Sequence, residues 1–185
     1  MSRLLAAAFC CALAACAGKG NDQPVRSYDL GVEAPRTPLP GLRAVTVRAP
    51  MPLDGVEMYY RLAWRDGAEI ASFANSRWAA PPAELMRRQL LRALPATSSA
   101  PCALEVELQD FSQRFSAPDT SEARIELRAW LATADSRIAA RSFSHAEAGA
   151  GANAASGAGA FARAAERAIG ELSGWIGAQP SCRGS

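Results

Sequence analysis

The sequence lacks the motifs and residue constellations that enzymes use for catalysis. It holds one histidine, His145, and a Ser–His–acid site would need that histidine beside a nucleophile and an acid. It contains no Gly-x-Ser-x-Gly motif, no phosphate-binding loop, no His-Glu-x-x-His motif and no dinucleotide-binding glycine pattern. Its cysteines lack metal-ligand spacing, so no zinc site is expected either. We therefore expect a binding protein and not an enzyme, without metal or cofactor.

The net charge is also small, and long apolar runs are few. The chain has 20 basic and 18 acidic side chains, and its formal net charge is +2 with the histidine neutral. Nucleic-acid-binding domains are strongly basic, so nucleic acid is not an expected partner. Beyond the N-terminal segment, no apolar run approaches the roughly 20 residues that a helix needs to cross a bilayer core. The folded part is expected to lie outside the membrane.

The N-terminus has the pattern of a bacterial lipoprotein signal. Arg3 supplies a positive charge, residues 4–13 form a short apolar stretch, and small residues follow. Leu13-Ala14-Ala15-Cys16 is a lipobox, in which a branched apolar residue and two small residues precede the cysteine that accepts the diacylglyceryl group. We predict a signal peptide over residues 1–15 and lipidation of Cys16. The alternatives are an ordinary secretory signal or an N-terminal core helix.

The lipidated cysteine would fix the protein to a membrane. Such a cysteine carries more than one acyl chain, and each buried methylene contributes about 0.8 kcal/mol, so the attachment is effectively permanent. Ala17 stands where an aspartate tends to keep lipoproteins in the inner membrane, which favours the periplasmic face of the outer membrane. Residues 17–24 read as a tether that reaches at most about 28 Å at about 3.5 Å per residue. One folded domain is expected over residues 25–185.

The five cysteines have three different expected fates. Cys10 and Cys11 leave with the signal peptide, and Cys16 is lipidated. Cys102 and Cys182 remain as a pair in an oxidising space, so a disulfide between them is predicted. In the chain-entropy model such a bond contributes at most about 4.5 kcal/mol to stability. The alternative is two unrelated thiols.

Hydrophobic periodicity predicts strands followed by a helix, then strands and a second helix. Alternation is clearest where Ile125 and Leu127 share one face and Arg124 and Glu126 the other. Prolines at 35, 38 and 40 mark a loop. This order predicts an α/β domain with a mixed sheet and helices packed on it. The expected strands are 26–32, 44–49, 58–64, 69–73, 103–111, 123–131 and 136–144, and the expected helices are 83–94 and about 154–176.

Trp130 is the residue that this pattern leaves unexplained. It falls on the polar face of its strand, next to Arg128 in the alternation. A helix could cover it if the sheet were buried on both faces. Otherwise it is a contact surface for a partner or an apolar ligand.

A second pattern lies in the middle of the chain, where a Tyr59-Tyr60-Arg61 strand leads to Asn75-Ser76-Arg77-Trp78 and then to Pro81-Pro82 at a helix start. In this pattern the chain resembles the ABC-type transport auxiliary lipoproteins, in which the segment matching residues 75–78 is a turn, and this segment is the most specific part of the resemblance. Further matches are Tyr28-Asp29-Leu30, the strands over 104–111 and 123–131, and a C-terminal helix closing on Trp175. The resemblance covers nearly the whole mature chain.

The resemblance implies a three-layer α/β domain. It also implies the lipoprotein component of an MCE-type ABC system, which moves phospholipids or other lipids between the two membranes of Gram-negative bacteria. Its partners would be the periplasmic MCE-domain protein and the permease and ATPase, with this chain as a docking part. Arg77 and Trp78 would fix the turn before the helix or join Trp130 in a partner or ligand surface, and the first role is favoured.

A second interpretation is an outer-membrane lipoprotein that binds a cell-wall synthase or peptidoglycan. Such proteins commonly carry a long tether, whereas about eight residues are available here. A periplasmic hydrolase is disfavoured because no nucleophile–base pair is present. The transported substrate, the partner surface and the choice between monomer and homo-oligomer stay open.

Overall fold

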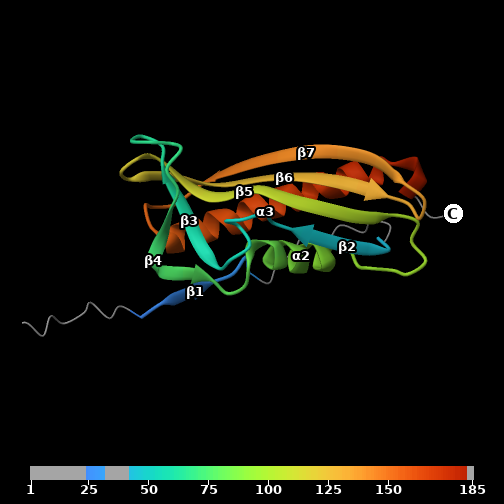
Figure 1. Cartoon of the computed structure of the whole chain (residues 1–185), viewed down its shortest axis with the longest axis horizontal. Helices are drawn as coiled ribbons and strands as arrows, with labels where there is room; N and C mark the ends of the chain where they lie inside the picture. The colour runs from blue at the N-terminus through green and yellow to red at the C-terminus, as the bar shows by residue number, and fades with distance from the viewer. Residues whose placement is uncertain (1–23, 32–41, 183–185) are drawn as a thin grey trace, which may run out of the picture.

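The structure is a computed structural model, and it describes residues 24–31 and 42–182 (Figure 1). The predicted signal peptide, Cys16, residues 17–23 of the tether and the prolines at 35, 38 and 40 lie outside the described residues. Within the described part, no helix is both long and apolar enough to span a membrane.

The described residues form a mixed sheet of seven strands with two α-helices. The strand order is β1-β4-β3-β5-β6-β7, and β2 also pairs with β5. The elements are β1 (Arg26–Tyr28), β2 (Ala44–Arg48), β3 (Glu57–Leu62), β4 (Ala71–Trp78), α2 (Pro82–Ala93), β5 (Ala103–Ala117), β6 (Thr120–Ala132), β7 (Arg137–Ala148), α3 (Ala154–Gly177) and the short 3₁₀ helix η2 (Pro180–Cys182).

The long strands β5, β6 and β7 form an antiparallel meander along the long axis of the molecule (Figure 1). Along its other edge, β5 pairs in parallel with two strands, β2 and β3. β2 pairs with its first part, where Val45 lies beside Leu104, and β3 pairs with its last part, where Leu62 lies beside Phe115. One continuous strand therefore joins the two ends of the sheet.

Both helices pack on the same face of the sheet. α3 lies against β6 and β7, α2 lies against β2, and the helices contact each other. The predicted stripe of α3 is confirmed, because all of its residues are buried: Ala158, Phe161, Ala165, Ile169, Leu172 and Ile176. On β6, the residues from Ala123 to Leu131 alternate between buried and more exposed, as predicted. The buried set lines the core that the helices cover.

The predicted α/β class, with a mixed sheet and helices packed on it, is confirmed. The described residues form two layers, sheet and helices, instead of the expected three. The reason is the alternation of the strands, since Glu105, Glu107 and Arg128 make the second face mostly polar, and a mostly polar face does not need a covering layer. This second face is called the open face below.

The segment Asn75–Trp78 is strand and not the turn that the sequence predicted. β4 runs over Ala71–Trp78 because β1 pairs with it in parallel, with Tyr28 beside Trp78. The amide of Trp78 also donates to the carbonyl of Val56 at 2.7 Å. These pairings join residues far apart in sequence, and the turn that the family resemblance implied at this segment is wrong.

Cys102 and Cys182, the two cysteines expected to pair, are joined by a disulfide, with S–S 2.03 Å and Cα–Cα 5.3 Å. Cys102 directly precedes β5, and Cys182 ends η2 just after α3. Both cysteines are buried. The bond ties the end of the last helix to the start of the central strand.

Candidate functional site

Trp130 is a large aromatic residue on the open face. It is half-buried on β6, directly opposite Glu105 of β5 and Ala140 of β7. Its neighbours on β6, Ala129 and Leu131, point into the core under the helices. Neither described helix covers Trp130, so the interpretation of a sheet buried on both faces is wrong.

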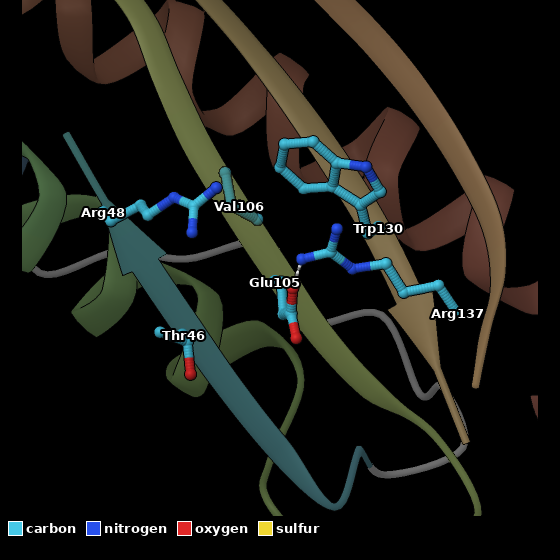
Figure 2. Close-up of a pocket in the computed structure, with 6 residues that line it drawn as sticks. All are labelled: Thr46, Arg48, Glu105, Val106, Trp130 and Arg137. Atoms are coloured by element: carbon cyan, nitrogen blue, oxygen red, sulfur yellow. Dashed lines mark hydrogen bonds and ion pairs between the residues drawn. The ribbon is translucent and has the colours of Figure 1, made fainter. Parts of the chain in front are cut away.

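Three guanidinium groups gather at the Trp130 ring. The Cζ atoms of Arg137, Arg128 and Arg48 lie 5.0, 5.4 and 5.7 Å from the ring centroid. Figure 2 shows Arg48 reaching in from β2 and Arg137 from β7, with Trp130 between them on β6. A cation within about 6 Å of an indole centroid is attracted by the electrons of the ring, by about 0.5–1 kcal/mol at an exposed site.

Two carboxylates hold two of these arginines in place. Arg137 Nη2 lies 2.5 Å from Glu105 Oε2, and Arg48 Nη2 lies 2.8 Å from Glu107 Oε2. Arg128 forms no ion pair with any described residue. The cluster therefore carries one more positive charge than negative, and that excess resides on the arginine that is free to meet an incoming group.

The side chains border a shallow hollow of about 280 Å³ on the open face. Its lining is Thr46, Arg48, Glu105, Val106, Trp130 and Arg137 (Figure 2). A hollow of this kind offers an indole face beside guanidinium donors. It can hold one apolar or aromatic side chain that is flanked by a carboxylate. We refer to these residues together with Arg128 and Glu107 as the Trp130 surface.

The other two predicted surface residues lie elsewhere. Trp78 is 1 % exposed and packs edge-on against Phe111 at 5.4 Å and Phe161 at 5.2 Å, so a surface role for it is wrong. It anchors the core, in line with the structural role favoured from the sequence. Arg77 is exposed on β4, where its Nε donates to Ser27 Oγ of β1 at 3.3 Å. Neither belongs to the Trp130 surface.

The single histidine lies apart from this surface and beside no nucleophile. His145 is buried between β7 and α3, with Nε2 3.7 Å from Glu171 Oε2. Ser144, its neighbour in sequence, points to the other face of β7. Among residues 24–31 and 42–182 there is also no group of His, Cys, Asp and Glu side chains that could hold a metal ion.

The sequence singled out Trp130 and Arg128 but missed the rest of the surface. Arg48, Glu105, Glu107 and Arg137 come from three other strands, and the strand register alone brings them to Trp130. Their polar positions in alternating strands were the available signal. Which strands lie side by side could not be read from that alternation.

Two solved structures share the fold. The crystal structure of protein XCC0632 from Xanthomonas campestris, of the family DUF330, superposes with a TM-score of 0.67 at 21 % identity, covering 83 % of this chain and 92 % of that one. A second crystal structure, of an uncharacterized protein, has a TM-score of 0.67 at 18 % identity and covers 83 % and 99 %. No family model and no curated protein matches the sequence. At these identities the likeness concerns the fold alone.

Proposed function

We propose that the protein is the lipid-anchored docking component of an MCE-type ABC system that carries phospholipids or related lipids between the inner and outer membranes. It binds the periplasmic MCE-domain protein or the permease, and it does not supply the ATPase. The resemblance of the sequence to the auxiliary lipoproteins supports this assignment. The α/β class with a mixed sheet agrees with the class that the resemblance implies, although the described residues form two layers and not three.

The Trp130 surface is the observation that carries the proposal. Trp and Arg are the residues most enriched at the energetic centres of protein interfaces. Here Glu105 and Glu107 position two guanidinium groups beside an indole on an uncovered face of the sheet. Positioning before binding lowers the entropy cost of immobilising long side chains. The excess positive charge at Arg128 favours a partner segment with an acidic residue.

The anchor restricts where the partner can be. Lipidation at Cys16 and a tether of about eight residues would keep the domain within about 28 Å of the membrane surface. A transport component that works at the envelope needs this confinement, whereas a soluble binding protein does not. The short tether also disfavours the cell-wall interpretation, which requires reach through peptidoglycan.

Co-purification from cross-linked envelopes tests the proposal. The wild-type chain should recover an MCE-domain or permease subunit, and Trp130→Ala should recover at least about tenfold less, the loss expected from about 1.4 kcal/mol at an interface centre. Arg77→Ala is the matched control, because it removes an exposed arginine outside the Trp130 surface and should recover the wild-type amount. Recovery of a cell-wall synthase or peptidoglycan in place of these subunits would contradict the transport assignment.

A further inference from the structure

The turn between β3 and β4 exposes two large apolar side chains. Trp64 is 48 % exposed on one side of the turn, and Ile70 is 37 % exposed on the other. They stand at the end of the sheet, away from the core that α2 and α3 cover. About half of the Trp64 side chain is left uncovered by the described residues, so this apolar surface is available to a partner outside the chain.

Hydrogen bonds fix the shape of this turn. Arg61 Nη1 donates to the carbonyls of Gly67 at 3.4 Å and Ala68 at 3.1 Å, and the amide of Ala68 donates to Asp66 Oδ1 at 2.8 Å. The amides of Arg65 and Asp66 donate to the carbonyl of Leu62. The turn thus holds Trp64 outward as a preformed feature.

The base of the turn is fixed as well. Tyr60 of β3 packs against Phe73 of β4 at 4.7 Å and against Phe115 of β5 at 5.8 Å between ring centroids. At the tip, the Arg65 guanidinium lies 5.8 Å from the Trp64 ring. An indole next to a guanidinium is the combination that suits the boundary between lipid headgroups and acyl chains.

The register of β1 connects this turn to the anchored end of the chain. β1 runs parallel to β4 with Arg26 beside Ser76, so Pro24 and Val25 lie toward the beginning of β4 and the Trp64 turn. Ile70 directly precedes β4 and is six positions before Ser76, so at most about 20 Å of extended chain separates them at about 3.3 Å per residue. In Figure 1, β1 and the β3–β4 turn lie at the same end of the long axis.

The short tether indicates that the membrane is the partner that contacts the exposed side chains of the Trp64 turn. The stretch from Cys16 to Pro24 reaches at most about 28 Å, comparable with the extended-chain limit of about 20 Å between Ser76 and Ile70. A domain anchored so closely brings this end of the sheet to the bilayer. Asp66 and Glu69 offset the charges of Arg61 and Arg65 at the turn, so the contact rests on Trp64 and Ile70 more than on net charge.

We propose that the Trp64 turn rests in the headgroup layer of the phospholipid membrane that holds the anchor, with Trp64 and Ile70 inserted at the boundary of the acyl chains. This inference rests on the anchor of the proposed function and is independent of the docking partner. The contact adds a second point of attachment to the first. A domain held at two points has a fixed orientation, whereas one acyl-linked tether would let it rotate.

Fluorescence quenching by lipids brominated on their acyl chains tests the contact. The full-length lipidated protein is placed in vesicles of phosphatidylethanolamine and phosphatidylglycerol, with and without the brominated lipid. The wild type should be quenched by the brominated lipid, and Trp64→Phe should abolish that component. Trp130→Phe is the matched control and should keep it, because Trp130 lies on the open face far along β6 from this turn. Both substitutions concern partly exposed side chains, and near-ultraviolet circular dichroism verifies that the fold persists.

Equal quenching of the wild type and Trp64→Phe would overturn the proposal, and so would a wild type that is not quenched. If Trp130→Phe were the variant that loses the signal, the open face would be the membrane contact and the proposal would again be wrong. A protein that does not attach to the vesicles at all would overturn the anchor together with the contact. Attachment without Trp64 quenching would overturn the contact alone.

Discussion

Glu105 lies directly opposite Trp130 in the sheet, and its Oε2 atom holds the Arg137 guanidinium at 2.5 Å. One carboxylate thus places a cation at 5.0 Å from the indole centroid of its cross-strand neighbour. The pair is solvent-exposed, and exposed ion pairs contribute only about 0–1 kcal/mol to folding. Its role is therefore better sought in binding than in stability.

Substituting Glu105 separates these two effects. Glu105→Gln keeps the shape of the side chain but releases Arg137, so the free energy of unfolding should change by less than about 1 kcal/mol while recovery of the partner falls. Glu122→Gln, at the other end of the same face and in a looser 3.8 Å ion pair with Arg124, should leave recovery unchanged. Urea unfolding and cross-linked co-purification measure the two quantities. Equal recovery from both variants would remove Glu105 from the binding surface.

The core position of Trp78 predicts a large loss of stability. Trp78→Ala removes a ring that packs edge-on against both Phe111 and Phe161, and it should lower the free energy of unfolding by about 3–5 kcal/mol. Arg77→Ala, one residue earlier, removes an exposed side chain and should cost no more than about 0.5 kcal/mol. Urea denaturation of both variants provides the comparison. Similar values for the two would show that Trp78 is not a core residue.

The disulfide should stabilise the domain through the loop that it closes. Cys102 and Cys182 are 80 residues apart, and removing both by substitution with serine should cost about 2–4 kcal/mol. Denatured, unreduced wild-type protein should react with no thiol reagent at these two positions. Labelling of both cysteines in the wild type would contradict the pairing.

Glu84 makes the stability of the domain depend on pH in the acid range. Hydrogen bonds from Arg87 and Arg88 lower the pKa of Glu84 from 4.5 to about 2. A carboxyl whose pKa is lowered by folding stabilises the native state above pH 4.5, and this stabilisation is lost as the pH falls toward 2. Because the side chain is one-third exposed, solvent screening limits the contribution to under about 1 kcal/mol.

Glu84→Gln should therefore be slightly less stable than the wild type at pH 7, and the difference should shrink as the pH is lowered. Glu166→Gln is a suitable control, because it removes an exposed glutamate of α3 that forms no ion pair among the described residues. Its free energy of unfolding should stay within about 0.5 kcal/mol of the wild type at pH 7. A difference between Glu84→Gln and the wild type that grows toward low pH would contradict the assignment.

The lipobox predicts a defined mature N-terminus. Intact-mass measurement of the membrane fraction should show a chain that starts at Cys16 and carries acyl mass. Cys16→Ser should leave the unprocessed precursor without lipid. A mature chain starting at another residue would show that Cys16 is not the attachment point.

Local periodicity was enough to predict the elements that bury one regular face. The alternation of β6 and the apolar stripe of α3 needed no knowledge of their partners, because each follows from a repeat of 2 or about 3.6 residues. The extension of β4 to Trp78 was missed, since it depends on parallel pairing with β1 across the chain. The Trp130 surface was found only in part for the same reason. Arg48 and Arg137 reach Trp130 through the registers of β2 on β5 and β7 on β6.

β5 carries β3 on one end and β2 on the other. Leu62, just before the Trp64 turn, is level with Phe115, whereas Trp130 is level with Glu105. These levels are roughly 33 Å apart at about 3.3 Å per residue. The strand is paired with β6 nearly throughout, so a rotation of the whole domain displaces both of its ends. If the domain tilted by about 10° about its Trp64 end, the Trp130 surface would be displaced by about 6 Å, roughly the length of two residues along a strand. A small change in the orientation of the domain at the proposed membrane contact would therefore produce a large change in the position at which a partner of the Trp130 surface has to bind.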